Sequence, residues 1–323
     1  MRRATSLSLA ALLLAGMGTV SCSAASSDRT SDKPNVVASF YPLAYAAERI
    51  GGGHVEVTNL VSPGVEPHDV ELAPRQMTKL SDADLVVYLK GFQPAVDEAV
   101  KQLDDDKVLD VSVVEVPDAP HGDAHAGESP ADPSHEPSEG DHGHDGDGHQ
   151  HADDPHRWLD PAWYAFAGHA IADWLGSVDP NNAADYEDRA EQFATELATL
   201  DQEYADGLAD CAKREIIVSH AAFGHLTDRY GLEQIAIAGL SPEQEPTPRR
   251  LAEMIEIARE HDATVIFFET LVSPEVARVI ADEVGAEVKV LDPLEGITAD
   301  RDEDYFSVMR ANLRALRTAL ECA

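Results

Sequence analysis

Basic residues are scarce in this sequence. Its 323 residues include 24 Lys and Arg against 60 Asp and Glu, which gives a formal net charge of −36 at pH 7. A surface that binds nucleic acid needs basic side chains to neutralise phosphates, so this balance excludes nucleic acid as an expected partner. An acidic surface suits a protein that meets cations, although acidity also keeps proteins soluble.

Cysteine is scarce as well. The chain has three cysteines, Cys22, Cys211 and Cys322, and no two of them are spaced as CxxC. This spacing argues against a cysteine-based metal site. In an exported chain, Cys211 and Cys322 are expected to form a disulfide, with two free thiols as the alternative.

Long apolar runs are absent after the N-terminus. The run Leu7–Val20 follows Arg2 and Arg3 and has the length of a signal peptide, which is too short to span a bilayer comfortably. Residues 1–21 are therefore predicted to be a signal peptide, and no later run predicts a membrane-spanning helix.

The end of this run predicts a membrane anchor. Residues 19–22 (TVSC) resemble a bacterial lipobox, which predicts a lipid on Cys22 and a polar tether over residues 22–34. The protein would then lie on the outer face of the bacterial cell membrane. Because Thr19 stands where Leu is usual, cleavage to a periplasmic or secreted protein is the alternative.

A His-rich segment interrupts the middle of the chain. Residues 118–154 contain no Lys or Arg and almost no large apolar side chains, so they cannot offset the entropy of ordering and are predicted to form a disordered loop. Neutral imidazole is a common zinc ligand, so the loop is predicted to collect metal weakly; a solvated acidic linker is the alternative. Its histidines are His121, His125, His135, His142, His144, His149 and His151.

Short apolar runs alternate with amphipathic segments along the rest of the chain. This alternation predicts an α/β protein with parallel sheets and helices on both of their faces. Predicted strands cover residues 35–40, 55–61, 84–89, 108–114, 215–219, 233–238, 263–268 and 287–291. Predicted helices cover residues 42–50, 74–81, 95–103, 161–175, 179–209, 223–230, 247–261, 273–284 and 304–320.

The longest predicted helix divides the chain into two lobes. Apolar residues recur every three or four positions from Tyr186 to Leu208, which predicts one long amphipathic linker helix over residues 179–210. An N-terminal lobe over residues 35–178 and a C-terminal lobe over residues 211–323 would flank it.

Several histidines and acids follow predicted strands or loops. Ligands bind outside the carboxyl ends of the strands in open α/β sheets, so such residues are candidate metal ligands. Three imidazoles and one carboxylate would suit tetrahedral zinc. Glu269 is predicted to hold a ligand histidine in place, with a helix cap as the alternative, and Asp292 has a turn-forming role as its alternative. The candidate ligands are His68, His156, His220 and Asp292.

Four motifs occur in a fixed order: EPHD at 66–69, DPHRWLDP at 154–161, SHAAFGHL at 219–226 and GLSPEQEP at 239–246. Together they resemble the zinc-specific solute-binding lipoproteins of bacterial ABC importers, the ZnuA-like proteins of the wider TroA/PsaA group. The resemblance covers about residues 35–322. It implies two Rossmann-like lobes, a rigid linker helix and a metal site in the cleft between the lobes.

The resemblance also implies a set of ligands. The motif histidines of the family fall on His68, His156 and His220, and its acidic ligand falls on Asp292. Manganese-binding relatives often have Glu where His220 stands, so the resemblance favours zinc. Cys211 and Cys322 look like the disulfide of zinc-binding relatives.

The expected function is capture of Zn²⁺ and its delivery to an ABC permease with its ATPase, by a monomeric protein that is not an enzyme. Manganese or iron import by the same architecture is one alternative, and a surface zinc buffer or adhesin is another. A zinc hydrolase is a weaker alternative because the sequence has no HExxH pair.

Overall fold

The computed structural model describes residues 33–117, 154–242, 246–297 and 303–323. The predictions for the signal peptide, for Cys22 and for the seven loop histidines fall outside these ranges. Within them, no helix combines the length and the apolar character needed to cross a bilayer.

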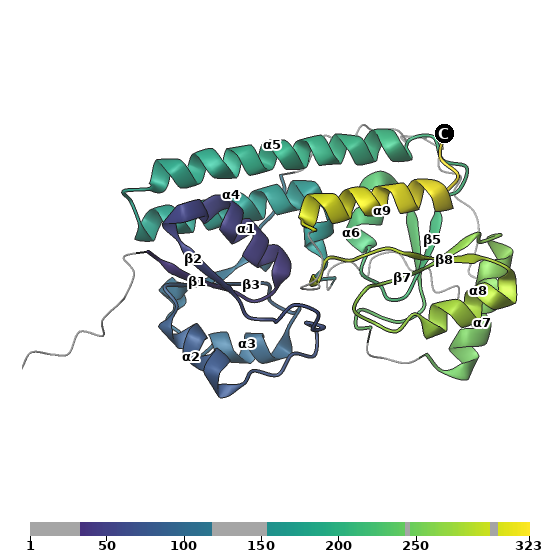
Figure 1. The fold of residues 1–323 in the computed structure, drawn as a ribbon, viewed down its shortest axis with the longest axis horizontal. Coiled ribbons are helices and arrows are strands. Elements are labelled where there is room, and N and C mark those ends of the chain that lie inside the picture. Colours follow the sequence, from purple (N-terminus) through teal and green to yellow (C-terminus); the bar gives the residue numbers. More distant parts are fainter. Residues whose placement is uncertain (1–32, 118–153, 243–245, 298–302) are drawn as a thin grey trace, which may run out of the picture. The chain divides into compact units, whose positions relative to one another are not determined.

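The N-terminal part of the described chain forms a parallel four-stranded sheet with the order β2-β1-β3-β4. Figure 1 labels three of these strands, β1, β2 and β3. Its strands are β1 (Asn35–Ala38), β2 (Glu56–Asn59), β3 (Leu85–Tyr88) and β4 (Val108–Asp110). The helices of this part are α1 (Tyr41–Gly51), α2 (Pro74–Asp82), α3 (Pro94–Val100) and α4 (Pro161–Val178).

The C-terminal part repeats the arrangement with the strand order β6-β5-β7-β8. Its strands are β5 (Glu215–Val218), β6 (Glu233–Ala236), β7 (Val265–Phe268) and β8 (Glu287–Val290). Its helices are α6 (Gly224–Tyr230), α7 (Pro248–Glu260), α8 (Glu275–Val284) and α9 (Tyr305–Ala319). The predicted pair of parallel-sheet α/β lobes is confirmed.

The long helix α5 (Ala183–Leu208) packs against α4 and also contacts α1, α6 and α9. Its buried side chains are the predicted stripe, Tyr186, Ala190, Phe193, Leu197, Leu200, Tyr204 and Leu208. Because α1 and α4 belong to the first lobe and α9 belongs to the second, α5 packs against both lobes.

Side chains alternate between two faces along each buried strand. In β1, Val36 and Ala38 face a large core, whereas Val37 faces a smaller one beneath α2 and α3. In β5, Ile216 and Val218 face the same large core as Val36, and Ile217 faces a small core beneath α7 and α8. The large core therefore contains residues from both sheets and from α1, α4, α5 and α9.

Local sequence signals set several helix ends. Asp160 caps α4 by accepting a hydrogen bond from the Ala162 N–H (2.8 Å), and Pro161 occupies the first turn. Thr247 caps α7 in the same way, and a capping box between Asp304 and Ser307 opens α9. Gly231 ends α6 with a φ of +65°, a backbone conformation that glycine adopts without strain.

Two boundaries differ from the prediction by four residues. The linker helix begins at Ala183 rather than at Asp179, because the Asp179 carboxylate binds Asn182 Nδ2 (2.6 Å) and Tyr186 Oη (2.8 Å) and stabilises a turn there. Strand β4 ends at Asp110, whose carboxylate accepts the Ser112 N–H (2.9 Å) and starts a 3₁₀ turn. Such side-chain hydrogen bonds compete with regular secondary structure. The short 3₁₀ helices are Gly52–His54, Asp105–Lys107, Val111–Val113 and Arg157–Leu159.

Cys211 and Cys322 form a disulfide, as expected. Cys211 follows α5 and Cys322 follows α9, so the bond ties the beginning of the second lobe to its end.

Candidate metal centre

Three histidines that are distant in the sequence meet in one place. His68 lies in the loop after β2, His156 lies just before the 3₁₀ turn Arg157–Leu159, and His220 lies two residues after the end of β5. One ligand atom from each of them, together with one from Glu295, fits within a span of 4.8 Å. All four side chains belong to residues that are at most 8% exposed.

The carboxylate of Glu295 is the centre of this cluster. Its Oε1 lies 3.3 Å from Nε2 of His68, 3.1 Å from Nε2 of His156 and 3.0 Å from Nε2 of His220. Zinc–nitrogen and zinc–oxygen bonds of about 2.0–2.1 Å place neighbouring tetrahedral ligands roughly 3.3 Å apart. The three distances from Oε1 to the imidazole nitrogens are therefore close to the oxygen–nitrogen separations of a four-coordinate zinc site.

The other oxygen of this carboxylate has no hydrogen-bond partner among the described residues. Glu295 is 1% exposed, and its Oε2 forms no hydrogen bond with the described residues. A buried carboxylate oxygen without a partner is costly, because burial removes it from water. A cation bound among the three imidazoles would compensate for this loss, so the donor set fits a metal ion.

Two further carboxylates hold the imidazole rings in place. His156 donates from Nδ1 to Asp154 Oδ1 (2.7 Å), and the same oxygen accepts the His156 backbone N–H (3.0 Å). His220 donates from Nδ1 to Glu269 Oε1, which also accepts the hydroxyl of Ser219. A carboxylate at Nδ1 fixes the ring and directs the Nε2 lone pair to a metal.

His68 is held differently. Its backbone N–H donates to Glu66 Oε1 (3.0 Å), and the edge of its ring packs against Phe92, with ring centroids 4.5 Å apart. The neighbouring Gln93 donates from Nε2 to the Pro67 carbonyl (3.3 Å) and anchors the loop that carries His68. Backbone and packing contacts thus orient this ring.

The cluster shifts the pKa values of its members. Burial lowers the pKa of His220, but hydrogen bonds and charges from Glu269 and Glu295 outweigh burial and raise it to about 10. Burial also opposes the charged form of His156, while Asp154 and Glu295 raise its pKa overall. Burial would raise the pKa of Glu295, but three imidazoles lower it well below its ordinary value. Without a metal, the centre therefore pairs imidazolium with carboxylate.

Asp292, the expected fourth ligand, does not join this cluster. Its carboxylate accepts the Leu294 N–H (2.8 Å) through Oδ1 and the Thr270 hydroxyl (2.9 Å) through Oδ2. The carboxylate near the imidazoles is that of Glu295, three residues later. Asp292 and Glu295 share the loop after β8, and Asp292 is the acid directly after the predicted strand.

Glu269 and three further histidines make other contacts or are exposed. Glu269 contacts His220 at Nδ1, the place expected of a residue that holds a ligand histidine. His225 donates from Nε2 to the Asp154 carbonyl (2.9 Å) and supports the His156 segment. His54 pairs with Asp185 (2.9 Å), and His261 is exposed.

Asp154 was missed although it lies in the DPHRWLDP motif. The signal that identifies it is its position two residues before a candidate ligand, which lets one carboxylate reach both the backbone and the ring of that ligand.

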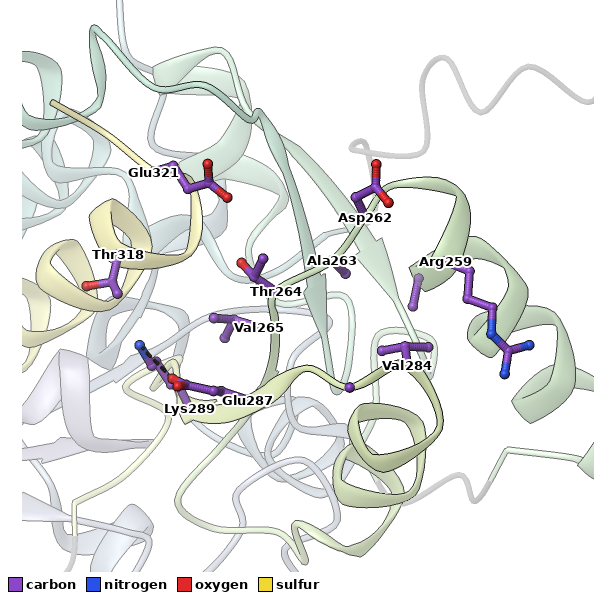
Figure 2. Close-up of a pocket in the computed structure, with 12 residues that line it drawn as sticks. Arg259, Asp262, Ala263, Thr264, Val265, Val284, Glu287, Lys289, Thr318 and Glu321 are labelled. Atoms are coloured by element: carbon purple, nitrogen blue, oxygen red, sulfur yellow. Dashed lines mark ion pairs between the residues drawn. The ribbon is translucent and has the colours of Figure 1, made fainter.

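A hollow lies at the end of the C-terminal sheet opposite the histidine cluster. It measures about 820 Å³ and is lined by Thr264, Val265 and Glu287, at the beginnings of β7 and β8, and by Lys289 and Thr318 (Figure 2). Two of its charged side chains are paired, with Lys289 Nζ 3.2 Å from Glu287. In parallel sheets ligands bind at the carboxyl ends of strands, so this hollow is not the candidate site.

Comparison with known proteins identifies the family of this chain. The family model for the zinc-uptake complex component A (ZnuA, periplasmic) matches residues 36–319. The high-affinity zinc uptake system protein ZnuA of Bacillus subtilis is 36% identical over 316 residues, which cover 96% of this chain and 94% of that protein. The zinc-binding lipoprotein AdcA of Streptococcus pneumoniae is 34% identical over 311 residues. The chain spans 60% of the length of AdcA.

Solved structures of related proteins have a similar fold. The Zn(II)-bound ZnuA-like domain of Streptococcus pneumoniae AdcA superposes with a TM-score of 0.70 at 30% identity, over 90% of this chain and 99% of that domain. The metal-dependent lipoprotein YcdH of Bacillus subtilis has a TM-score of 0.69 at 33% identity, over 89% of this chain and 99% of that one. Because the family model matches residues 36–319 and the Bacillus subtilis protein is 36% identical over nearly its whole length, this chain belongs to the ZnuA family of zinc-uptake components.

Proposed function

We propose that this chain captures Zn²⁺ outside the cytoplasm and delivers it to the permease of an ABC importer. One observation carries the proposal: three imidazole nitrogens surround Glu295 Oε1 at 3.0–3.3 Å in a buried cluster, and Glu295 Oε2 has no partner among the described residues. His68, His156, His220 and Glu295 are the proposed ligands.

The donor set supports zinc over manganese or iron. Three nitrogens and one oxygen, with the oxygen 3.0–3.3 Å from each nitrogen, suit Zn²⁺, whereas Mn²⁺ prefers more oxygen donors in an octahedral arrangement. Zn²⁺ also stands above Mn²⁺ and Fe²⁺ in the general order of affinities for nitrogen ligands. The names of the AdcA and ZnuA relatives, which are zinc-binding and zinc-uptake proteins, support the same metal.

Capture fits the site better than catalysis does. A catalytic zinc keeps an open position for water or substrate, but here four protein donors converge. The residues that provide them are at most 8% exposed, which leaves little room for a second reactant.

The partners follow from the family. Its description names a periplasmic component of a zinc-uptake complex, which supports a permease and its ATPase as partners and an extracytoplasmic location. We place the protein at the outer face of the cell membrane through a lipid on Cys22.

The decisive test is metal stoichiometry and competition on the purified chain. We expect one tightly held Zn²⁺ per molecule that excess Mn²⁺ does not displace, and we expect its loss in His156→Ala. The exposed His261→Ala is the matched control and retains the ion. Tighter binding of Mn²⁺ than of Zn²⁺, or a tightly held Zn²⁺ that survives in His156→Ala, would contradict the proposal.

A further inference from the structure

One residue beside the proposed metal ligand has an unusual backbone. Among the described residues other than glycine, Asp262, Leu294 and Glu321 have positive φ angles. Asp262 and Glu321 lie just beyond the C-caps of α7 and α9, where left-handed residues are common. Leu294 follows no helix, and its φ is +59°.

A left-handed conformation is unfavourable for leucine, because its Cβ lies too close to the following carbonyl oxygen. Such a residue persists only where its surroundings determine its conformation, and these residues concentrate at functional sites. Leu294 is fully buried and directly precedes Glu295. Its backbone therefore sets where the Glu295 carboxylate points.

Asp292 holds this turn from within. Its Oδ1 accepts the Leu294 N–H at 2.8 Å, which satisfies a buried donor, and its Oδ2 accepts the Thr270 hydroxyl at 2.9 Å. Asp292 is fixed in turn by Asn312 of α9, which accepts the Asp292 N–H (2.9 Å) and donates to its carbonyl (2.7 Å).

A second contact holds the turn from outside. Trp158 donates from Nε1 to the Pro293 carbonyl at 2.7 Å, and Trp158 follows the proposed ligand His156 by two positions. The turn of Glu295 is thereby tied to the segment that carries an imidazole of the same centre.

We infer that Asp292 is a positioning residue, not a ligand: its side chain locks the left-handed turn at Leu294 and so aims Glu295 at the three imidazoles. This inference rests on the proposed function, because Glu295 needs aiming only if the centre binds a metal. Asp292 then influences zinc affinity without contacting the ion.

The test begins with substitutions at Asp292 and measures the zinc Kd by competition with a chelator. Asp292→Ala is expected to weaken zinc binding by about 10- to 100-fold, the range for residues that orient metal ligands. Asp292→Asn keeps an acceptor for the Leu294 N–H and is expected to stay within about threefold of the parent chain. Equal losses in Asp292→Asn and Asp292→Ala would mark a direct ligand and overturn the inference.

A double-mutant cycle isolates the backbone strain. Leu294→Ala and Leu294→Gly leave nearly the same cavity, but only glycine tolerates a positive φ without strain. Asp292→Ala is expected to weaken zinc binding in both backgrounds. The factor by which it weakens binding should be at least about fivefold smaller with Leu294→Gly than with Leu294→Ala. Equal losses in the two backgrounds would overturn the inference.

Each variant is first checked for folding by circular dichroism in its metal-free form. A parent chain that binds no zinc would overturn the proposed function and this inference with it. A parent chain that binds zinc, beside a folded Asp292→Ala that binds it equally well, would overturn the inference alone.

Discussion

Glu295 Oε1 lies 3.1 Å from Nε2 of His156, although 139 positions separate the two residues in the chain. His156 belongs to the part of the chain that forms the first sheet and its helices, and Glu295 follows the last strand of the second sheet. The proposed ligand set therefore draws on both lobes, and a bound ion would bridge them.

Replacing Glu295 tests the proposed fourth ligand. Glu295→Gln keeps the size of the side chain and removes its charge, so we expect the zinc Kd to rise roughly 100-fold, or about 3 kcal/mol. Isothermal titration with a competing chelator measures the change. The exposed Glu275→Gln serves as the control, and an unchanged Kd in Glu295→Gln would exclude Glu295 as a ligand.

Replacing Asp154 tests the support of a single imidazole. Asp154→Asn removes the charge that faces His156 Nδ1, so we expect an affinity for zinc about 10- to 100-fold lower. The exposed Asp210→Asn is the matched control. If both variants bind zinc as the parent chain does, the contact between Asp154 and His156 does not contribute to the centre.

The stability of the metal-free protein is expected to fall as the medium becomes alkaline. The pKa of His220 is about 10 in the folded chain and about 6.5 in the unfolded chain. The contribution of His220 to the free energy of unfolding is complete below about pH 6.5, where the folded and unfolded chains are both protonated. This contribution is lost as the pH rises through about 10. Urea unfolding of metal-free protein across this window measures the slope, which His220→Gln should reduce.

The stabilisation of the fold by bound zinc should change with pH in the opposite direction. Zinc ligation needs neutral imidazoles, so binding must displace the protons that His156 and His220 hold. We therefore expect the rise in Tm caused by zinc to grow from about pH 6 to about pH 8. A zinc-induced rise in Tm that is the same across this range would contradict the protonated metal-free centre.

The disulfide is expected to stabilise the fold without affecting zinc. It joins cysteines 111 positions apart, so its removal in the double variant Cys211→Ser/Cys322→Ser should cost roughly 4 kcal/mol in the chain-entropy account. Cys322 follows Glu321, which lines the hollow at the end of the sheet opposite the metal centre, so the zinc Kd should not change. Chemical denaturation and zinc titration of the double variant measure both quantities.

Deleting residues 121–151 separates a transporter from a zinc buffer. The deletion leaves Asp154 and His156 in the chain, so we expect the tight site to remain and only the weak zinc capacity to fall. Metal analysis after dialysis against graded chelator concentrations distinguishes the two classes of site. Loss of the tight site would favour the buffer alternative.

Much of the fold follows from local patterns. Runs such as Leu85–Tyr88 are buried on both faces of a parallel sheet, and the stripe from Tyr186 to Leu208 has a clear helical period. The start of α5 was wrong by four residues, because the hydrogen bonds of Asp179 depend on the relative placement of Asn182 and Tyr186.

The site was only partly predictable, and the reason is backbone conformation. His68 and His220 follow strands at their carboxyl ends, which a predicted topology is enough to locate. Choosing Glu295 over Asp292 requires knowing that Leu294 adopts a positive φ, and a leucine gives no such signal. The contacts that hold it there come from Thr270, Asn312 and Trp158, which are distant in sequence.

The large core shared by the two sheets determines how the molecule unfolds. Val36 of β1, Leu197 of α5 and Val218 of β5 belong to one continuous buried cluster, so neither lobe can melt without exposing apolar surface of the other. Unfolding should therefore be a single cooperative event for the described chain. The free energy of zinc binding would then slow hydrogen exchange throughout the cluster, including at amides of α5 that contact no ligand.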